Sequence, residues 1–323
     1  MNDLTKRLGI QLPFIQGGMG NISEPILAAA VSNAGGLGTI GAGTRSAAEV
    51  KTLIRELKTR TDKPFALNIP ISVNEEARAL AQLAVEEHVP VVSLSAGNPA
   101  PFLQKLKEHK KAVIVVVSSA RQAVKAEAAG ADVLVAEGTE AAGINASQEL
   151  TTLTLLPLVC RAVSIPAAAA GGVSDGASFA AVLSLGAQGA QLGTRLIATE
   201  EAQVHQHYKD ALIQSGEQAT IVVGRRYGRV RRLLDTPYAR MLERLESEEE
   251  NDARYMEKTD EESHIRGAVH GRLDAGHTNA GQAAAGITDH PPVRVVLENI
   301  LHGAEAQLLQ ASRSLSSFST EQL

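Results

Sequence analysis

Two glycine-rich segments near the middle of the chain have the composition of an anion-binding site. Residues 165–195 read IPAAAAGGVSDGASFAAVLSLGAQGAQLGTR, in which one apolar run ends at Gly171–Gly172 and a second at Gly193–Thr194. Glycine lets the backbone approach a ligand closely, and the amides that begin a helix carry the positive end of its dipole. The two segments therefore predict a phosphate site, although tight turns in an alanine-rich chain give the same pattern.

Two polar residues stand where apolar runs of strand length end. Glu137 follows the apolar run 131–136 and precedes Gly138. A carboxylate in this position belongs at the end of a strand and not on an outer surface, which favours a functional role. Asn68 precedes Ile69–Pro70 and by itself is more typical of a residue that satisfies a backbone group at a strand end.

The elements that would position these residues alternate along the first two thirds of the chain. Helix-like patterns separate short apolar runs that lack period-two alternation, as strands buried on both faces do. The strand-like runs cover residues 13–16, 37–40, 64–69, 89–95, 112–117 and 131–136, with two more inside 165–195. The helix-like patterns cover residues 24–33, 46–58, 74–87, 99–108, 120–129 and 151–163. Eight such units predict an α/β fold, the (β/α)8 TIM barrel, whose loops after strands seven and eight would hold the phosphate.

A doubly wound open sheet uses the same alternation and is the alternative architecture. The count of eight units and the absence of a GxGxxG fingerprint in the first unit favour the barrel. With 323 residues, of which 44% are hydrophobic, the chain can bury one large core and carry extensions.

The character of the sequence changes after the barrel-like region. We divide the chain into a barrel at 1–214, an inserted helical cap at 215–270 and a tail at 271–323, because long insertions on barrels usually act as lids. The tail should return to the barrel through a loop and a helix at about 292–312, with residues 313–323 frayed. A cluster of five arginines in the cap predicts either a solvated helix face or a site for an acidic ligand. These are Arg225, Arg226, Arg229, Arg231 and Arg232.

Composition and charge argue against several classes of function. The net charge of −5, with acids and bases interspersed, leaves no basic stripe for nucleic acid. The single cysteine, Cys160, cannot form an internal disulfide and is typical of a buried thiol in a reducing cytoplasm. No signal peptide or apolar run of 18 residues is visible, so we expect a soluble cytoplasmic protein without a membrane span. No histidine or cysteine cluster predicts a metal site, and His264 is expected to face solvent.

Six motifs occur in the order seen in a known family. They are Gln16–Gly17–Gly18–Met19, Ala34–Gly35–Gly36–Leu37–Gly38, Lys63–Pro64–Phe65–Ala66–Leu67–Asn68, Ala136–Glu137–Gly138, Ala170–Gly171–Gly172 and Gly193–Thr194–Arg195. As a set, over residues 11 to about 312, they resemble the nitronate monooxygenase family, formerly called 2-nitropropane dioxygenases. The tail resembles the enoyl-acyl-carrier-protein reductase II branch of that family. The tail residues concerned are His270, Gly271, Asp274, Gly276, Ala280, Gly281 and Gln282.

The resemblance implies FMN at the C-terminal mouth of the barrel, with NADH or NADPH as electron donor. The flavin ring and ribityl chain would contact Gly17, Gly18, Met19, Asn68 and Glu137. The phosphate would be bound by Gly171, Gly172, Gly193 and Thr194. The ring would be covered by Ala280, Gly281 and Gln282. The resemblance further implies an acyl-thioester substrate, an acyl carrier protein as partner, a homodimer, and a monovalent cation held by carbonyls of the tail.

The loop after the sixth strand departs from the family pattern. It reads AEGTEAAGIN over residues 136–145, and Ile144 occupies the place of a histidine that in the family is thought to transfer protons or bind substrate. An isoleucine can neither donate nor accept a proton. The polar candidates for this work are Glu140, Asn145 and Ser147.

Three interpretations of function stay open at the level of sequence. The first is NAD(P)H-dependent reduction of a conjugated enoyl thioester. The second is flavin chemistry on another substrate, either nitronate oxidation or a NAD(P)H:quinone-type reduction. The third is a non-catalytic FMN-binding protein that has lost the proton-handling histidine.

Overall fold

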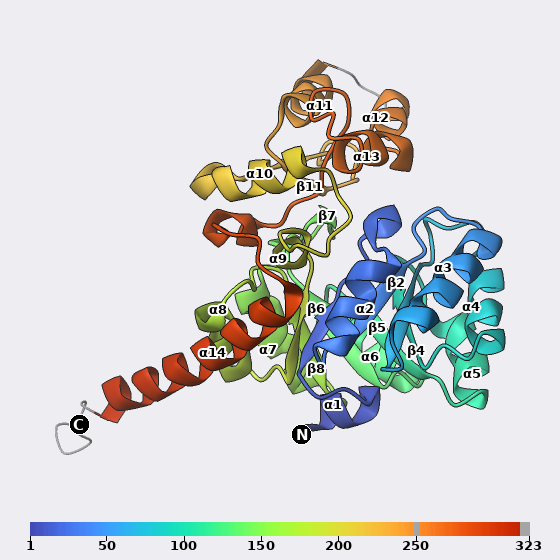
Figure 1. The fold of residues 1–323 in the computed structure, drawn as a ribbon, viewed down its shortest axis with the longest axis vertical. Coiled ribbons are helices and arrows are strands. Elements are labelled where there is room, and N and C mark those ends of the chain that lie inside the picture. Colours follow the sequence, from blue (N-terminus) through green and yellow to red (C-terminus); the bar gives the residue numbers. More distant parts are fainter. Residues whose placement is uncertain (249–251, 317–323) are drawn as a thin grey trace.

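The computed structural model describes residues 1–248 and 252–316 and contains an eight-stranded parallel barrel (Figure 1). Neighbouring strands pair in the order β1-β9-β8-β6-β5-β4-β3-β2, and a parallel bridge between Ile15 and Leu37 joins the two ends. The predicted (β/α)8 barrel is confirmed, because a doubly wound open sheet would leave its edge strands apart. The strands are β1 (Phe14–Gln16), β2 (Gly38–Gly41), β3 (Phe65–Pro70), β4 (Val91–Ser95), β5 (Ala112–Val117), β6 (Val133–Glu137), β8 (Ala167–Ala170) and β9 (Gly189–Leu192).

A helix follows each barrel strand. A local side chain sets the start of some of these helices. Ser46, for example, caps α3 (Ala47–Arg60) through a capping box with Glu49. The helices that follow the strands are α2 (Pro25–Asn33), α3 (Ala47–Arg60), α4 (Ala77–Glu86), α5 (Ala100–Glu108), α6 (Ala120–Ala128), α7 (Thr152–Ala162), α8 (Gly176–Ser184) and α9 (Thr194–Ile197). One more helix, α1 (Asp3–Leu8), precedes β1, and its Leu4 and Leu8 pack against the apolar side chains inside the barrel.

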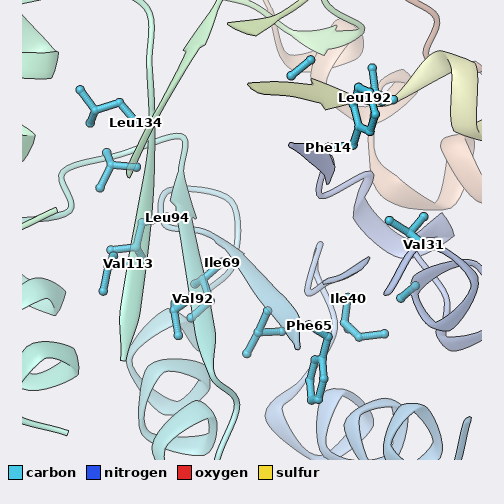
Figure 2. Close-up of a cluster of buried hydrophobic side chains, with 14 of the residues drawn as sticks. Phe14, Val31, Ile40, Phe65, Ile69, Val92, Leu94, Val113, Leu134 and Leu192 are labelled. Atoms are coloured by element: carbon cyan, nitrogen blue, oxygen red, sulfur yellow. The ribbon is translucent and has the colours of Figure 1, made fainter. Parts of the chain in front are cut away.

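Alternation along the strands divides the apolar core into two layers. Every second side chain along a strand points into the barrel interior, and Ile114, Val133 and Val135 are examples of this set. Side chains of the other parity pack under the helices, and Figure 2 shows Ile69 and Leu134 in this outer layer. Each fully buried aliphatic side chain contributes roughly 1.5–3 kcal/mol. The two layers therefore hold the strand ends, and whatever residues they carry, in fixed positions.

The top of the barrel interior is polar. Ala170 belongs to the interior layer, and the register places Glu137 and Gln191 beside it on the neighbouring strands. Asn68 pairs with Ser93 in the same way. Because paired residues of parallel strands face the same side, these four polar side chains lie on the interior face at the C-terminal mouth.

A second, smaller sheet joins the cap to the barrel. β10 (Thr220–Val223) and β11 (Arg231–Leu234) form an antiparallel hairpin, and the two-residue strand β7 (Gly143–Ile144) from the loop after β6 pairs with β11. The arginine-rich segment is therefore a hairpin and not the helix face considered from the sequence. Its turn contains Gly224 and Gly228, whose φ angles of 81° and 64° require glycine.

Four helices complete the cap: α10 (Gln206–Gln214), α11 (Pro237–Glu248), α12 (Ala253–Lys258) and α13 (Glu261–Ala268). In Figure 1 they lie together, above the barrel. The cap has an apolar cluster of its own, in which Leu233, Leu242 and Tyr255 are buried. The sequence-based boundary at 214 stays a prediction, although α10 lies with the cap in Figure 1.

The tail returns to the barrel and ends in a long helix. A short 3-10 helix, η3 (Gln282–Gly286), precedes α14 (Val293–Ser316), which packs against α8 and α2. The expected terminal helix outside the barrel is confirmed. Residues 313–316 are helical and not frayed as predicted, and residues 317–323 lie outside the described part of the chain. Among the helices of the described ranges, none is long and apolar enough to cross a membrane.

Candidate active site

The predicted cofactor residues come together at the C-terminal mouth of the barrel. The N–H of Gly17 donates to the carbonyl oxygen of Leu192, the last residue of β9, at 2.9 Å. This hydrogen bond joins the ends of β1 and β9. Met19 Sδ lies 4.0 Å from the position that a Cβ on Gly193 would take. The N–H of Gly281 donates to Thr194 Oγ1 at 2.9 Å. Segments separated by more than 250 residues in the sequence therefore surround one space, and the role of each as a cofactor contact stays a prediction.

Gly18 and Asn68 touch each other at the ends of β1 and β3. A Cβ on Gly18 would lie 2.3 Å from Asn68 Cγ, so no larger residue fits without a shift. Asn68 is 5% exposed, and its Nδ2 donates to Ser93 Oγ at 3.3 Å and to Ser95 Oγ at 3.2 Å. Its Oδ1 accepts no hydrogen bond from the described residues. The neighbouring strand thus orients the amide and leaves one acceptor for a ligand.

Two glycines after β8 form an open backbone cradle. Gly171 and Gly172 have φ angles of 98° and 75°, in the left-handed region. The position of a Cβ on Gly172 has no atom within 3.8 Å, and that on Gly193 none within 4.0 Å. In the part of the chain that is described, the N–H groups of Gly172 and Gly193 donate to no protein acceptor. An oxyanion such as a phosphate fits this open, donor-lined space.

The start of α8 contributes less to this cradle than the sequence suggested. Asp175 Oδ1 accepts a hydrogen bond from Ser178 N at 2.8 Å, so the helix satisfies one of its own first-turn amides. Gly176 is buried against Gly303 of α14. The donors that face the cradle are therefore loop amides.

The tail segment 280–282 lies between the end of β9 and the loop after β6. Thr194 is 5% exposed, and because its Oγ1 accepts from Gly281 it keeps its own O–H as a donor. The N–H of Gln282 donates to Glu140 O at 2.9 Å. Ala280 is fully buried. These bonds fix the segment against the mouth, where the resemblance places it over a flavin.

Glu137 is a carboxyl without a partner at the end of β6. It faces the barrel interior, and it makes no hydrogen bond or ion pair with any described residue. It also lines a small cavity of about 10 Å³, which has room for one water at most, together with Ser118, Asn145 and Glu149. Desolvation by the surrounding barrel raises the pKa of Glu137 to about 7. The group can therefore hold or release a proton near neutral pH.

The three polar candidates in the loop after β6 have different surroundings. Both carboxylate oxygens of Glu140 accept from Thr152 N, at 2.9 and 2.8 Å, so this side chain caps α7. Asn145 Nδ2 donates to Ala141 O at 3.0 Å and to a second loop carbonyl, which folds the loop. Ser147 is exposed on the same loop. Their catalytic assignment stays a prediction. Glu140 and Asn145 already make hydrogen bonds that hold α7 and the loop in place.

The arginine cluster is divided among different partners. Arg225 forms two hydrogen bonds of 2.8 Å with Glu149, and Arg229 bonds Asp252 at 2.8 Å. Arg232 is 6% exposed and donates to Thr139 O at 2.8 Å, which anchors the hairpin to the loop after β6. These arginines consequently do not form one free basic patch.

A polar network that sequence reasoning missed lies between the cap and the mouth. His264 is 2% exposed, contrary to prediction, because α13 turns it inward to bond Glu261 at 3.3 Å. Asn279 Nδ2 lies 3.3 Å from His264 Nε2. The ring of His277 is fully buried, stacks on that of His264 with centroids 5.2 Å apart, and bonds Arg231 at 2.9 Å.

Some of the missed residues carry a signal in the sequence. Ser93, Ser95 and Gln191 share the strand parity of the interior residues, and each stands as a lone polar residue in an apolar run. The network around His277 has no such signal, since its members come from β11, α13 and the tail. Among the described residues, no group of three histidine, cysteine, aspartate or glutamate side chains could hold a metal ion. The predicted cation at the tail carbonyls stays a prediction.

Fold and site together define a barrel enzyme with an open, donor-lined cradle at its C-terminal mouth and a tail segment beside that cradle. The chain belongs to the nitronate monooxygenase family, whose model matches residues 2–303. Members of this family are flavin-dependent oxidoreductases, and the chain is an oxidoreductase of the same family.

Three similar proteins come from different bacteria. The structure of FabK from Thermotoga maritima aligns with a TM-score of 0.93 and 39% identity, over 97% of this chain and 99% of that chain. A nitronate monooxygenase from Paraburkholderia phytofirmans is 32% identical over 96% of each chain. A dehydrogenase from Rhodococcus jostii, named for a 5-hydroxy-7a-methyl-1-oxo-octahydro-1H-indene-4-carboxyl-CoA, is 37% identical over 74% of this chain and 67% of its own length.

Proposed function

We propose that the protein is an FMN-dependent oxidoreductase that uses NADH or NADPH to reduce a conjugated enoyl thioester. The observation that carries the proposal is the tail segment 280–282, which is bonded to Thr194 and Glu140 beside the open cradle. This segment is where the sequence resembles the enoyl reductase II branch, and the similarity to FabK extends over nearly the whole chain. The Rhodococcus relative, a dehydrogenase of a CoA thioester by name, supports a thioester substrate.

The residues present fit FMN. The N–H groups of Gly172 and Gly193 and the hydroxyl of Thr194 would hold the phosphate, because a dianion needs several fixed donors. Asn68 would offer its free Oδ1 to the ring edge, and Gly18 lets the backbone approach closely. When bound, the flavin supplies the ring that takes up and gives back electrons.

The chain itself must hold a proton and exclude water. Glu137 is the group at the mouth that can store a proton near neutral pH, since burial raises its pKa to about 7. The tail segment and the cap would shield the substrate from solvent. An acyl carrier protein as substrate carrier is part of the proposal, and it would compete with Glu149 for Arg225 and with Asp252 for Arg229.

Anaerobic stopped-flow mixing tests the proposal. The purified protein should be yellow, its absorbance near 450 nm should bleach with NADH or NADPH, and crotonyl thioester should restore the colour. A colourless protein, or a flavin that neither nicotinamide bleaches, would contradict the proposal. A flavin that bleaches but is not reoxidised by any enoyl thioester would leave a flavoprotein with another electron acceptor.

Nitronate oxidation is the second candidate, because the Paraburkholderia relative matches over 96% of both chains. Propionate-3-nitronate should then bleach the flavin under nitrogen without any nicotinamide. The predicted homodimer and cytoplasmic location are also part of the proposal. Light scattering coupled to gel filtration checks the first, with the mass of a 33.9 kDa chain as the monomer reference.

A further inference from the structure

Arg231 has an unusually incomplete set of partners for a partly buried arginine. Its guanidinium carries five N–H donors, and one of them, on Nη1, bonds His277 Nε2 at 2.9 Å. It makes no other hydrogen bond and no ion pair with the residues described here. Its side chain is only partly buried, so the remaining donors are open to a ligand.

The network around Arg231 fixes the guanidinium in place. Since an arginine only donates, His277 Nε2 must accept, and its proton lies on Nδ1, which is buried without a partner. Burial, with the nearby charge of Arg231 in second place, lowers the pKa of His277 and keeps the ring neutral. His277 stacks on His264, which in turn bonds Glu261 and Asn279.

The carboxylate that belongs to this network, Glu261, is already engaged by other donors. Glu261 Oε1 accepts from the N–H of Asn21 at 3.1 Å and from His264 at 3.3 Å. Glu261 attracts Arg231 from a distance without bonding it. The guanidinium thus keeps a positive charge and unused donors, and its burial makes an anion the favourable partner.

Arg231 lies beside the mouth of the barrel. It pairs across the small sheet with Ile144, and directly paired residues of antiparallel strands place their side chains on the same face. Ile144 is 51% exposed and stands where the family resemblance places a histidine. Asn279, from the same network, lies 3.6 Å from the position of a Cβ on Gly143, the neighbouring residue. Asn21, which bonds Glu261, belongs to the loop after β1.

We propose that Arg231, held by His277, binds a substrate oxygen that is conjugated to the reacting carbon and that carries or develops negative charge. The inference rests on the proposed function and extends it to the substrate class. When hydride adds to the β-carbon of an enoyl thioester, the C=C electron pair moves toward the thioester carbonyl and negative charge develops on its oxygen. That charge is lost when a proton from solvent or an acid reaches the α-carbon. N–H donors aimed at such an oxygen stabilise it, which needs no proton transfer by residue 144.

A nitronate carries the same chemistry in its ground state, as two conjugated oxygens with one negative charge. One group of this chain, Arg231, would therefore serve either kind of substrate. Turnover assays distinguish the two kinds of substrate. Turnover of crotonyl thioester indicates an enoyl thioester substrate, and turnover of propionate-3-nitronate indicates a nitronate substrate.

Nitrate, a planar oxyanion, is the probe for a binding test at constant ionic strength. Its affinity is measured on the apoprotein from the rise in thermal midpoint, and on the yellow holoprotein from the flavin difference spectrum. Arg231→Gln should weaken nitrate binding about tenfold or more, because a charge-assisted bidentate pair is lost. Arg229→Gln is the matched control, since it removes an equal charge from the turn of the same hairpin, where the side chain is half exposed and bonds Asp252. Its nitrate affinity should equal that of the native protein.

Arg231→Lys keeps the charge but not the planar fork and should bind nitrate with intermediate affinity. This variant also serves if Arg231→Gln does not fold. Equal nitrate affinity in native protein and in the folded Arg231 variants would overturn the inference, as would the absence of any nitrate binding to native protein. With either substrate, kcat should fall while bleaching by nicotinamide stays intact. If nicotinamide bleaches the flavin but the Arg231 variants keep native nitrate affinity and kcat, this inference alone is refuted. If the protein is colourless but binds nitrate through Arg231, the proposed function alone is refuted.

Discussion

Glu137 shows how position on a strand sets the chemistry of a residue. The same carboxyl on the outer face of β6 would lie under α6 and α7, whereas its interior parity places it at the mouth beside Ala170. No donor of the described chain stabilises its charged form, and burial raises its pKa to about 7. The side chain can therefore hold a proton near neutral pH, at the end of the strand before the loop in which Ile144 replaces the expected histidine.

Replacement of Glu137 by glutamine tests that stored proton through stability. A pKa raised from about 4.5 to about 7 means that the folded apoprotein binds the proton more tightly than the unfolded chain, so folding loses stability between these two pH values. Glu137→Gln should be as stable as native protein at pH 4.5 and more stable at pH 8, by about 3 kcal/mol at most. Urea unfolding of the apoproteins measures the difference. An exposed control, Glu217→Gln, should show no such pH trend, and a Glu137→Gln curve parallel to native would contradict the raised pKa.

Ile144→His tests whether the missing histidine limits turnover. The new side chain would share the face of the small sheet with Arg231. If Arg231 stabilises the substrate oxyanion, the histidine is not needed and kcat with crotonyl thioester should change less than about threefold. A gain of roughly 10²–10⁴, the range of general acid–base catalysis, would show instead that proton transfer was lost with the histidine. Ile144→Gln is the control for polarity without a titrating group.

At the scale of elements, the loop after β6 connects α7, the hairpin of the cap and the tail at the mouth of the barrel. It caps α7 through Glu140, adds β7 to the hairpin of the cap, accepts from the tail at Glu140 O, and receives Arg232 at Thr139 O. Three elements from later in the chain therefore hold one loop. Its carboxyl group at residue 140 is oriented by a helix start and is not free at the mouth.

Glu140→Ala should consequently destabilise the protein by about 1–2 kcal/mol, as the loss of a helix cap does. Chemical denaturation of the apoprotein measures this change, with Glu217→Ala as an exposed control. Flavin retention should weaken in parallel, because the loop bounds the cradle at Gly171 and Gly172. Unchanged stability together with a loss of turnover would point to the catalytic role expected from the sequence.

At the scale of the whole molecule, the barrel was predictable, whereas the hairpin and the polar network around Arg231 were not. The barrel depends on local signals: uniform apolar runs such as AVIVVV, and glycines after other runs such as AAAA at residues 167–170. A helix face was one of the two interpretations of the arginine cluster, because the charges of the hairpin obscure its short strand pattern. The network around Arg231 joins residues 231, 261, 264, 277 and 279, and no spacing rule connects them. The glycine cradle was found through its residue types, whereas its bonds to the tail required the fold.

Docking of the C-terminal helix depends on one close approach. A Cβ on Gly176 at the start of α8 would lie 2.3 Å from the backbone of Gly303 in α14. Gly176→Ala should thus destabilise the protein by about 2 kcal/mol, as overpacking does, even though alanine favours helices. Thermal unfolding measures the loss, and the exposed neighbour substitution Ala177→Ser should have little effect. A variant as stable as native protein would mean that α14 is free to shift.

The contact between Gly281 and Thr194 also sets an order of events during synthesis. The cradle itself can form once the ribosome has released residue 194, because β9 is then available to pair with β1 and close the barrel. The segment that covers the ligand space emerges about 90 residues later, after the whole cap. A nascent chain would therefore pass through a stage with a closed barrel and an uncovered cradle, in which a ligand could reach the cradle before the last contacts form. Chains released before residue 281 would lack the contact that holds the tail segment against Thr194.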